Sequence, residues 1–170
     1  MFERHPSRLL ALTAGLLLVT GCDRGEDPTE PAPFPAENVI FDDTFGEGID
    51  YQAFAGSKTD AVQIDTSERF DGEASLRIAV PVPTDPSGSF AGGAFVASIG
   101  RDLTSYNALT FYAKAATAAN LEVAGLGNDN TGTSLYSAQT ERLALSSTWT
   151  RYVIPIPDPS KLSQERGLFF

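Results

Sequence analysis

Six side chains in this sequence combine residue types and expected exposure that suit recognition of a small ligand. A flat aromatic ring can stack on the apolar C–H face of a sugar while polar groups beside it bond the hydroxyls, and aromatic linings with a few placed polar groups are typical of small-ligand sites. In ALTFYAKA (108–115), Tyr112 and Lys114 lie on the face opposite Leu109 and Phe111, so we expect them to point out of the core. The other four stand in or beside predicted loops: Phe90, Asn128, Asp129 and Tyr136.

Each of these residues also has a purely structural interpretation, which the sequence leaves open. Phe90 could plug one end of the fold, and the two tyrosines could pack on neighbouring strands. Asn128 and Asp129 are common turn formers. Trp149 stands at the start of a predicted strand, and we expect it to be a core or rim residue, because large aromatic side chains are usually buried.

The first 37 residues have the features of an export signal followed by a tether. Two arginines precede an apolar run, Leu9 to Val19, and two small residues stand just before Cys22. This order is typical of a secretory signal peptide, and the run is shorter than the roughly 20 residues of a membrane-spanning helix. Residues 23–37 are rich in acids and prolines, so we expect a disordered, extended linker.

The four residues before and including the cysteine, VTGC (19–22), resemble the lipobox of bacterial lipoproteins. The resemblance implies that residues 1–21 are removed and that Cys22 becomes the lipidated first residue. Several acyl chains on one residue supply the multiple signals that stable anchoring needs. The expected location is the bacterial cell envelope, at the outer membrane and cell surface or at the periplasmic face, with the membrane contacted through the lipid anchor only.

Catalytic chemistry has little support in the residue types. The only histidine, His5, lies in the predicted signal peptide, and Cys22 has no second cysteine to pair with. A serine or cysteine nucleophile with a histidine base therefore cannot be assembled in the mature chain. Carboxylates are plentiful, yet no spacing indicates the pair that a glycosidase holds across its cleft. We expect a non-catalytic protein, and a small glycosidase or lyase is the alternative.

Length and charge limit the number of domains and the partners. Residues 38–170 provide room for one domain. The formal net charge of −10 disfavours nucleic acid and anionic lipid headgroups, because like charges repel, whereas a neutral ligand is unaffected. Without a cysteine pair in the mature domain, stability must come mainly from a packed core.

The hydrophobic pattern has a period of two residues and predicts strands. Many short alternating runs separated by Gly, Asn, Asp, Ser and Pro clusters favour an antiparallel sandwich or barrel. The only helix candidate is SKLSQER (160–166). The predicted strands are VIFDD (39–43), AVQID (61–65), SLRIAVP (75–81), GAFVASI (93–99), ALTFYAKA (108–115), LEVAGLG (121–127), ERLALS (141–146) and WTRYVIPIP (149–157).

The sequence stops in the apolar run GLFF (167–170). An exposed aromatic edge strand invites aggregation, so we expect the C-terminal strand to be truncated. A short final strand tucked into the core is the alternative.

Several of these stretches come in the order seen in carbohydrate-binding modules of the galactose-binding-like superfamily. They are VIFDDTF, FDGEASLRIAVP, SGSFAGGAF, YNALTFYAKA, LEVAGLGND, the W-x-x-Y-x-IPI run and GLFF. Residues 38–170 resemble such modules attached to secreted bacterial polysaccharide-degrading enzymes. The resemblance implies a β-jelly-roll of two stacked antiparallel sheets that binds sugar on a concave face or in the loops at one end.

The resemblance also implies a structural calcium ion in some members. Its ligands come from acids of the first strand, the turn before the Gly-x-x-Ser-Leu strand and the closing strand. Asp42 and Asp43 match the first source, and Asp71 with its Gly72–Glu73 turn matches the second. The third source has no counterpart up to Phe170.

Together these observations predict non-catalytic binding of a polysaccharide or oligosaccharide by a membrane-anchored lipoprotein. If the chain is a piece of a longer protein, the domain could target an attached glycoside hydrolase. The alternative is a structural or adhesive β-sandwich that binds no sugar. The sequence indicates neither the sugar nor the oligomeric state.

Overall fold

Antiparallel strands are the main elements of residues 34–170, the part of the chain that this computed structural model describes. The predicted signal peptide, Cys22 and most of the predicted linker lie outside it. The elements are β1 (Phe41–Asp42), β2 (Thr44–Phe45), β3 (Ile49–Ala53), β4 (Val62–Asp65), β5 (Ser75–Ile78), β6 (Gly93–Arg101), β7 (Ala108–Ala113), β8 (Ala119–Leu126), β9 (Ala138–Leu145), β10 (Thr150–Pro155), the short 3-10 helix η1 (Pro159–Lys161) and β11 (Glu165–Phe169). The predicted all-β class is confirmed.

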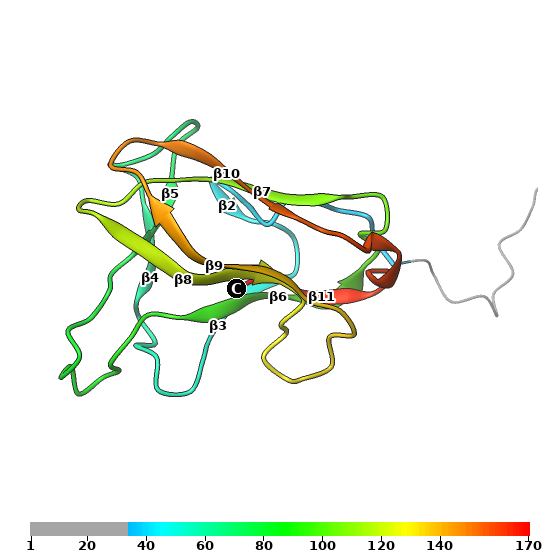
Figure 1. The fold of residues 1–170 in the computed structure, drawn as a ribbon, viewed down its shortest axis with the longest axis horizontal. Helices are drawn as coiled ribbons and strands as arrows, with labels where there is room; N and C mark the ends of the chain where they lie inside the picture. Colours follow the sequence, from blue (N-terminus) through cyan, green and yellow to red (C-terminus); the bar gives the residue numbers. More distant parts are fainter. Residues whose placement is uncertain (1–33) are drawn as a thin grey trace, which may run out of the picture. The chain divides into compact units, whose positions relative to one another are not determined.

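The first layer is built around β6. This strand pairs antiparallel with β3 on one edge and with β11 on the other. β11 lies in turn beside the β8–β9 hairpin, because Phe170 and Gly125 exchange backbone hydrogen bonds of 2.9 and 3.0 Å and Gly127 donates to the carbonyl of Gly167 at 2.7 Å. The order of strands in this layer is therefore β9-β8-β11-β6-β3 (Figure 1).

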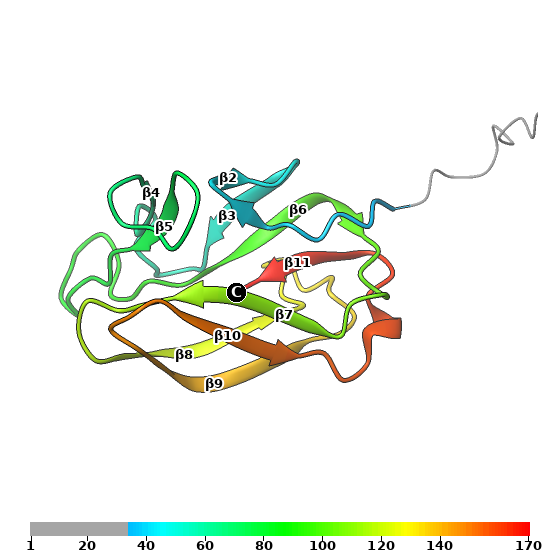
Figure 2. The same ribbon diagram turned by 90° about the horizontal axis from the view of Figure 1, so that it is seen from above.

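The second layer contains the antiparallel pair β7–β10, which lies over the first layer in Figure 1. Figure 2 views the molecule from above, with β6 and β11 near the middle of the view. The β4–β5 pair and β2 lie on one side of them in this view, and β7 and β10 lie on the opposite side. Antiparallel pairs in two layers are consistent with the predicted β-sandwich.

The core lies between these layers and has the periodicity that the sequence predicts. One cluster contains Ile49, Phe95, Ala97 and Leu168, and Phe95 stacks on Phe169 with ring centroids 5.7 Å apart. A second cluster surrounds Leu126, Ala138, Ile156 and Leu162. The predicted alignment of Tyr152, Ile154 and Ile156 on one face is confirmed, because both isoleucines are buried while the alternate residues Val153 and Pro155 are exposed.

Three segments differ from the sequence-based expectation. The predicted strand 39–43 is reduced to β1, because the chain turns back at Asp43 and pairs with itself as β2. Residues 49–53, which the pattern analysis did not select, form β3, since pairing with β6 gives this short stretch its backbone partners. The helix candidate 160–166 is helical only in η1, Pro159–Lys161, and its last residues open β11 instead. Hydrogen bonding to β6 satisfies their backbone groups better than one isolated helical turn would.

The GLFF stretch is an internal strand of the first layer and not an exposed edge. Gly167 and Leu168 are buried, and Phe169 packs against Phe95 and Phe111. Its neighbours β6 and β8 cover both edges of the backbone. Continuation of the chain beyond Phe170 stays a prediction.

Candidate functional site

The six side chains predicted to bind a ligand occupy three separate places. Tyr112 and Lys114 belong to the outer face of β7 and its end, Phe90 stands in the loop before β6, and Asn128, Asp129 and Tyr136 belong to the loop between β8 and β9. Among the described residues, no hydrogen bond, ion pair or aromatic contact joins the three places. Each place is therefore a site of its own.

Three aromatic rings with exposed surface lie together around Tyr112. The ring of Phe70, from the turn between β4 and β5, stacks on Tyr112 with centroids 3.8 Å apart and planes 9° from parallel. Trp149, just before β10, meets Phe70 edge-on at 6.3 Å. Phe70 and Tyr112 remain 50% and 45% exposed. We call Phe70, Tyr112 and Trp149 the aromatic cluster.

A charged pair borders the aromatic cluster. Lys114 forms an ion pair with Glu68, and its Nζ lies 5.6 Å from the centroid of the Trp149 ring. A surface ion pair of this kind adds little stability. It does hold an ammonium group and a carboxylate beside the rings, where they can donate and accept hydrogen bonds.

The turn that presents Phe70 is braced from both ends. Asp65 Oδ1 accepts hydrogen bonds from the amide of Ser67 at 2.8 Å and from its hydroxyl at 2.6 Å, and these bonds lower the pKa of Asp65. Arg69 donates to the carbonyls of Gly72 at 2.9 Å and Thr66 at 2.8 Å. Phe70 is therefore held in place before any ligand arrives, which reduces the entropy lost on binding.

The acids predicted to hold calcium contribute to the same turn. Asp43 Oδ1 accepts from the amides of Glu73 at 2.7 Å and Ala74 at 2.8 Å. Asp71 Oδ1 accepts from the adjacent amide of Gly72 at 2.9 Å, and Asp42 is exposed on β1. In residues 34–170 there is no group of three or more acidic, histidine or cysteine side chains placed to hold a metal ion. Asp43 therefore fastens β1 and β2 to the turn.

Phe90 is a second exposed aromatic residue, 41% exposed, and it makes no ring–ring contact with another described residue. Its carbonyl accepts from the amide of Lys58 at 2.9 Å, and Lys58 Nζ donates to Ser87 Oγ at 2.9 Å. These bonds tie together the two loops on either side of Phe90. A lone half-exposed ring offers a smaller platform than the aromatic cluster does.

Asn128 and Asp129, in the loop between β8 and β9, form hydrogen bonds to other residues of the same loop. Asp129 is only 1% exposed, and both of its carboxylate oxygens accept from the amides and hydroxyls of Thr131 and Thr133. Burial alone would raise the pKa of Asp129, but these hydrogen bonds hold it well below its ordinary value. Asn128 Oδ1 accepts from the amide of Asn130 at 3.0 Å. The turn-forming interpretation describes both side chains.

Tyr136 also has internal partners. Its hydroxyl accepts from the amide of Asp158 at 3.1 Å, and Lys161 Nζ lies 5.4 Å from its ring centroid. Asn128, Asp129 and Tyr136 therefore help to fix the structure of this end of the molecule, and their part in ligand binding stays a prediction.

Sequence reasoning selected Tyr112 and Lys114, which lie at the aromatic cluster, and did not select Phe70. It predicted Trp149 to be a core or rim residue. Trp149 is half-buried at the rim, as expected, but it also borders the exposed ring of Phe70. The available signal for Phe70 was an aromatic residue opening the polar turn FDGEA (70–74). A large ring in a turn has no neighbouring strand to cover it, so it packs on the side chain of another element, here Tyr112.

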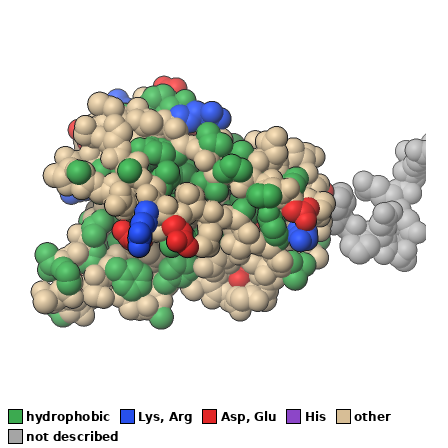
Figure 3. All heavy atoms as spheres, in the orientation of Figure 1, with side chains coloured by type: hydrophobic (Ala, Val, Ile, Leu, Met, Phe, Trp, Pro, Cys, Tyr) green, Lys and Arg blue, Asp and Glu red, His purple; other side chains and the backbone are tan. Residues whose placement is uncertain are grey.

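Charged side chains are few and scattered on the face that Figure 3 shows, and hydrophobic side chains lie among uncharged polar ones. In residues 34–170 no helix has the length and apolar character needed to span a membrane. Comparisons with protein-family models, with curated proteins and with solved structures gave no match for this chain. The geometry of the aromatic cluster therefore carries the functional argument.

Proposed function

We propose that this protein binds a neutral polysaccharide, without cleaving it, on the aromatic cluster of Phe70, Tyr112 and Trp149. The observation that carries the proposal is the exposed ring of Phe70. Tyr112 covers one of its faces at 3.8 Å, so the exposed half of the side chain presents the opposite face. A flat, fixed ring of this kind suits the C–H face of a pyranose.

The polar groups beside the rings favour binding of a sugar, which has hydroxyl groups, rather than a purely apolar ligand. The Lys114–Glu68 pair can donate to and accept from ring hydroxyls. The net charge of −10 disfavours anionic polymers, whereas it leaves neutral glycans unaffected. In this proposal the domain is the carbohydrate-binding jelly roll that the sequence resembles, held at a bacterial cell envelope by lipid on Cys22.

Affinity electrophoresis of the purified domain through gels containing soluble glucans, galactans, mannans or xylans tests the proposal. We expect one class of glycan to retard the wild-type protein and Phe70→Ala or Tyr112→Ala to weaken this binding at least tenfold. Val123→Ala is the matched control, because Val123 is similarly exposed (43%) and lies on β8, a strand of the other layer that pairs with β9 and not with β7 or β10.

Absence of retardation in every glycan would overturn the sugar-binding proposal and favour the structural or adhesive β-sandwich. Retardation that Phe70→Ala and Tyr112→Ala leave unchanged would place the binding surface elsewhere. Release of reducing sugar by the purified domain, abolished by a single carboxylate substitution, would favour the glycosidase alternative.

A structural calcium ion near Asp42, Asp43 and Asp71 stays a separate proposal. Calcium takes six to eight oxygen ligands, so carbonyl groups and waters would have to complete this set. We expect added calcium to raise the thermal midpoint of the wild-type domain and to leave that of Asp71→Asn unchanged. Equal midpoints with calcium and with a chelator in the wild-type domain would exclude the ion.

A further inference from the structure

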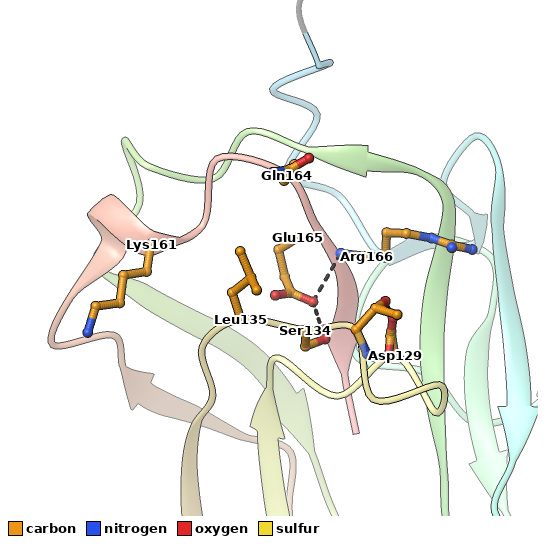
Figure 4. Close-up of a pocket in the computed structure, with 8 residues that line it drawn as sticks. Asp129, Ser134, Leu135, Lys161, Gln164, Glu165 and Arg166 are labelled. Atoms are coloured by element: carbon orange, nitrogen blue, oxygen red, sulfur yellow. Dashed lines mark hydrogen bonds between the residues drawn. The ribbon is translucent and has the colours of Figure 1, made fainter.

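A pocket of about 260 Å³ opens between the β8–β9 loop and the start of β11, away from the aromatic cluster. Its walls include Ser134, Leu135, Lys161 and Glu165 (Figure 4). Ligand pockets generally run from about 300 to 1,000 Å³. This one is therefore suited to a ligand no larger than a single ring.

The feature that distinguishes the pocket is the carboxylate of Glu165, a side chain only 4% exposed. Its Oε1 accepts three hydrogen bonds, from Ser134 Oγ at 2.6 Å and from the amides of Arg166 at 3.0 Å and Gly167 at 2.7 Å. These bonds fix the orientation of the carboxylate. The second oxygen, Oε2, receives no hydrogen bond from any described residue.

Oε2 is directed into the pocket. Figure 4 shows it pointing away from the two dashed bonds, toward the side on which Leu135 and Lys161 lie. Among the described residues, no side-chain polar atom is both fully buried and without a partner, so the unpartnered Oε2 keeps some exposure. A ligand can approach this oxygen directly.

In residues 34–170, no cationic side chain forms an ion pair with Glu165. Lys161 forms its ion pair with Asp158, Nζ to Oδ2 at 3.1 Å, and Arg166 donates through Nε to the carbonyl of Ala97 at 3.0 Å. A buried charge is costly unless it is paired. The chemical group that complements Oε2 best is therefore a positively charged hydrogen-bond donor.

We propose that this pocket binds the primary ammonium group of a small organic amine, with Glu165 as its anchor. The exposed Leu135, 77% exposed, lines the mouth and can cover the short carbon skeleton of the ligand. A single carboxylate oxygen is too few to hold calcium by itself. An amino sugar is one such amine, so the site could read a charged unit of a glycan, but the proposal does not rest on the aromatic cluster.

Isothermal titration of the domain with glucosamine, glucose and N-acetylglucosamine tests the proposal, because the three probes share a ring and differ in the charged amine. We expect glucosamine to bind and the two neutral sugars to bind at least tenfold more weakly. Glu165→Gln should weaken glucosamine binding about tenfold, since it removes the charge but keeps a similar shape. Lys161→Met should strengthen it, because a positive charge that lines the pocket and repels an ammonium group is removed.

The effect of Lys161→Met keeps the test informative if Glu165→Gln fails to fold. Phe70→Ala should leave glucosamine binding unchanged, which separates this site from the aromatic cluster. Equal binding of glucose and glucosamine would overturn the ammonium assignment. Absence of glucosamine binding, or binding that both pocket variants leave unchanged, would overturn the site.

Discussion

At the scale of single residues, the acids of this domain are used mainly to fix turns. Asp129 satisfies four donors of its own loop, and Asp43 satisfies two amides of the turn that carries Phe70. A buried donor left unpaired costs about 1–3 kcal/mol. Carboxylates in these positions therefore stabilise the loops around the proposed sites and need not contact a ligand themselves.

Asp129→Asn tests this role through its dependence on pH. The pKa of Asp129 is lowered in the folded protein, so its stabilising contribution is present above the unfolded value and is lost as pH falls below about 4. We expect the variant to lose about 1–3 kcal/mol of unfolding free energy at pH 7. The difference from wild type should shrink as the pH is lowered, in urea denaturation at several pH values.

Glu73→Gln is the control for that comparison, because Glu73 is exposed and its side chain has no hydrogen-bond partner among the described residues. It should leave stability close to wild type at every pH. A difference between Asp129→Asn and wild type that stays constant down to pH 2 would contradict the proposed cause.

At the scale of elements, β6 pairs with β3 and β11, and its last residue also holds the segment that precedes β3. Arg101, its last residue, is 3% exposed and donates to the carbonyls of Glu37, Val39 and Glu47 at 2.9, 3.1 and 3.0 Å. Burial lowers the pKa of this guanidinium, and the charge of Glu37 partly offsets the effect. One side chain thus fastens the segment preceding β3 to the sheet.

Arg101→Met should release that segment. We expect a loss of about 2–4 kcal/mol of unfolding free energy, because the carbonyls lose their donor. The unfolding free energy of Arg101→Lys should lie between those of the wild type and Arg101→Met. An ammonium group keeps the charge, but it cannot donate to three separated carbonyls as the planar guanidinium group does. Urea denaturation gives the energies, and hydrogen exchange should rise in residues 38–49. Unchanged exchange there would show that other contacts hold the segment.

At the scale of the whole molecule, the described domain stabilises itself by packing two β layers, with no cysteine among residues 34–170. Its net charge of −10 is compatible with the uncharged ligand proposed for the aromatic cluster. The proposed attachment point, Cys22, precedes this domain in the sequence and lies outside the described residues. Binding and anchoring are therefore assigned to different parts of the chain.

Cys22→Ser in the full chain tests the anchor. Wild-type protein produced in a bacterial host should incorporate labelled fatty acid and enter the detergent phase on phase separation. The variant should do neither, because the sulfur that carries lipid is absent, while its glycan retardation stays unchanged. Labelling of the variant, or absence of label in the wild type, would contradict the lipobox assignment.

Much of the fold follows from local patterns. Alternation in ALTFYAKA correctly placed Leu109 and Phe111 inward and Tyr112 outward. The same reasoning overlooked β3, whose residues 49–53 are short and gain their partners only from β6. It also placed a helix where β11 begins, because a polar stretch carries no sign of the strand that will lie beside it.

The sequence alone determined the strand periodicity, the outward position of Tyr112 and the acidic charge. It also determined that residues 34–170 contain no histidine that could act as the base for a nucleophile. Each of these properties depends on residue type or on backbone geometry over a few neighbours. Only the tertiary structure decided that Phe70 meets Tyr112, that Asp43 serves a turn and that Glu165 faces a pocket. These contacts join residues far apart in the chain. They depend on the register of paired strands and on how the layers stack, which no local pattern records.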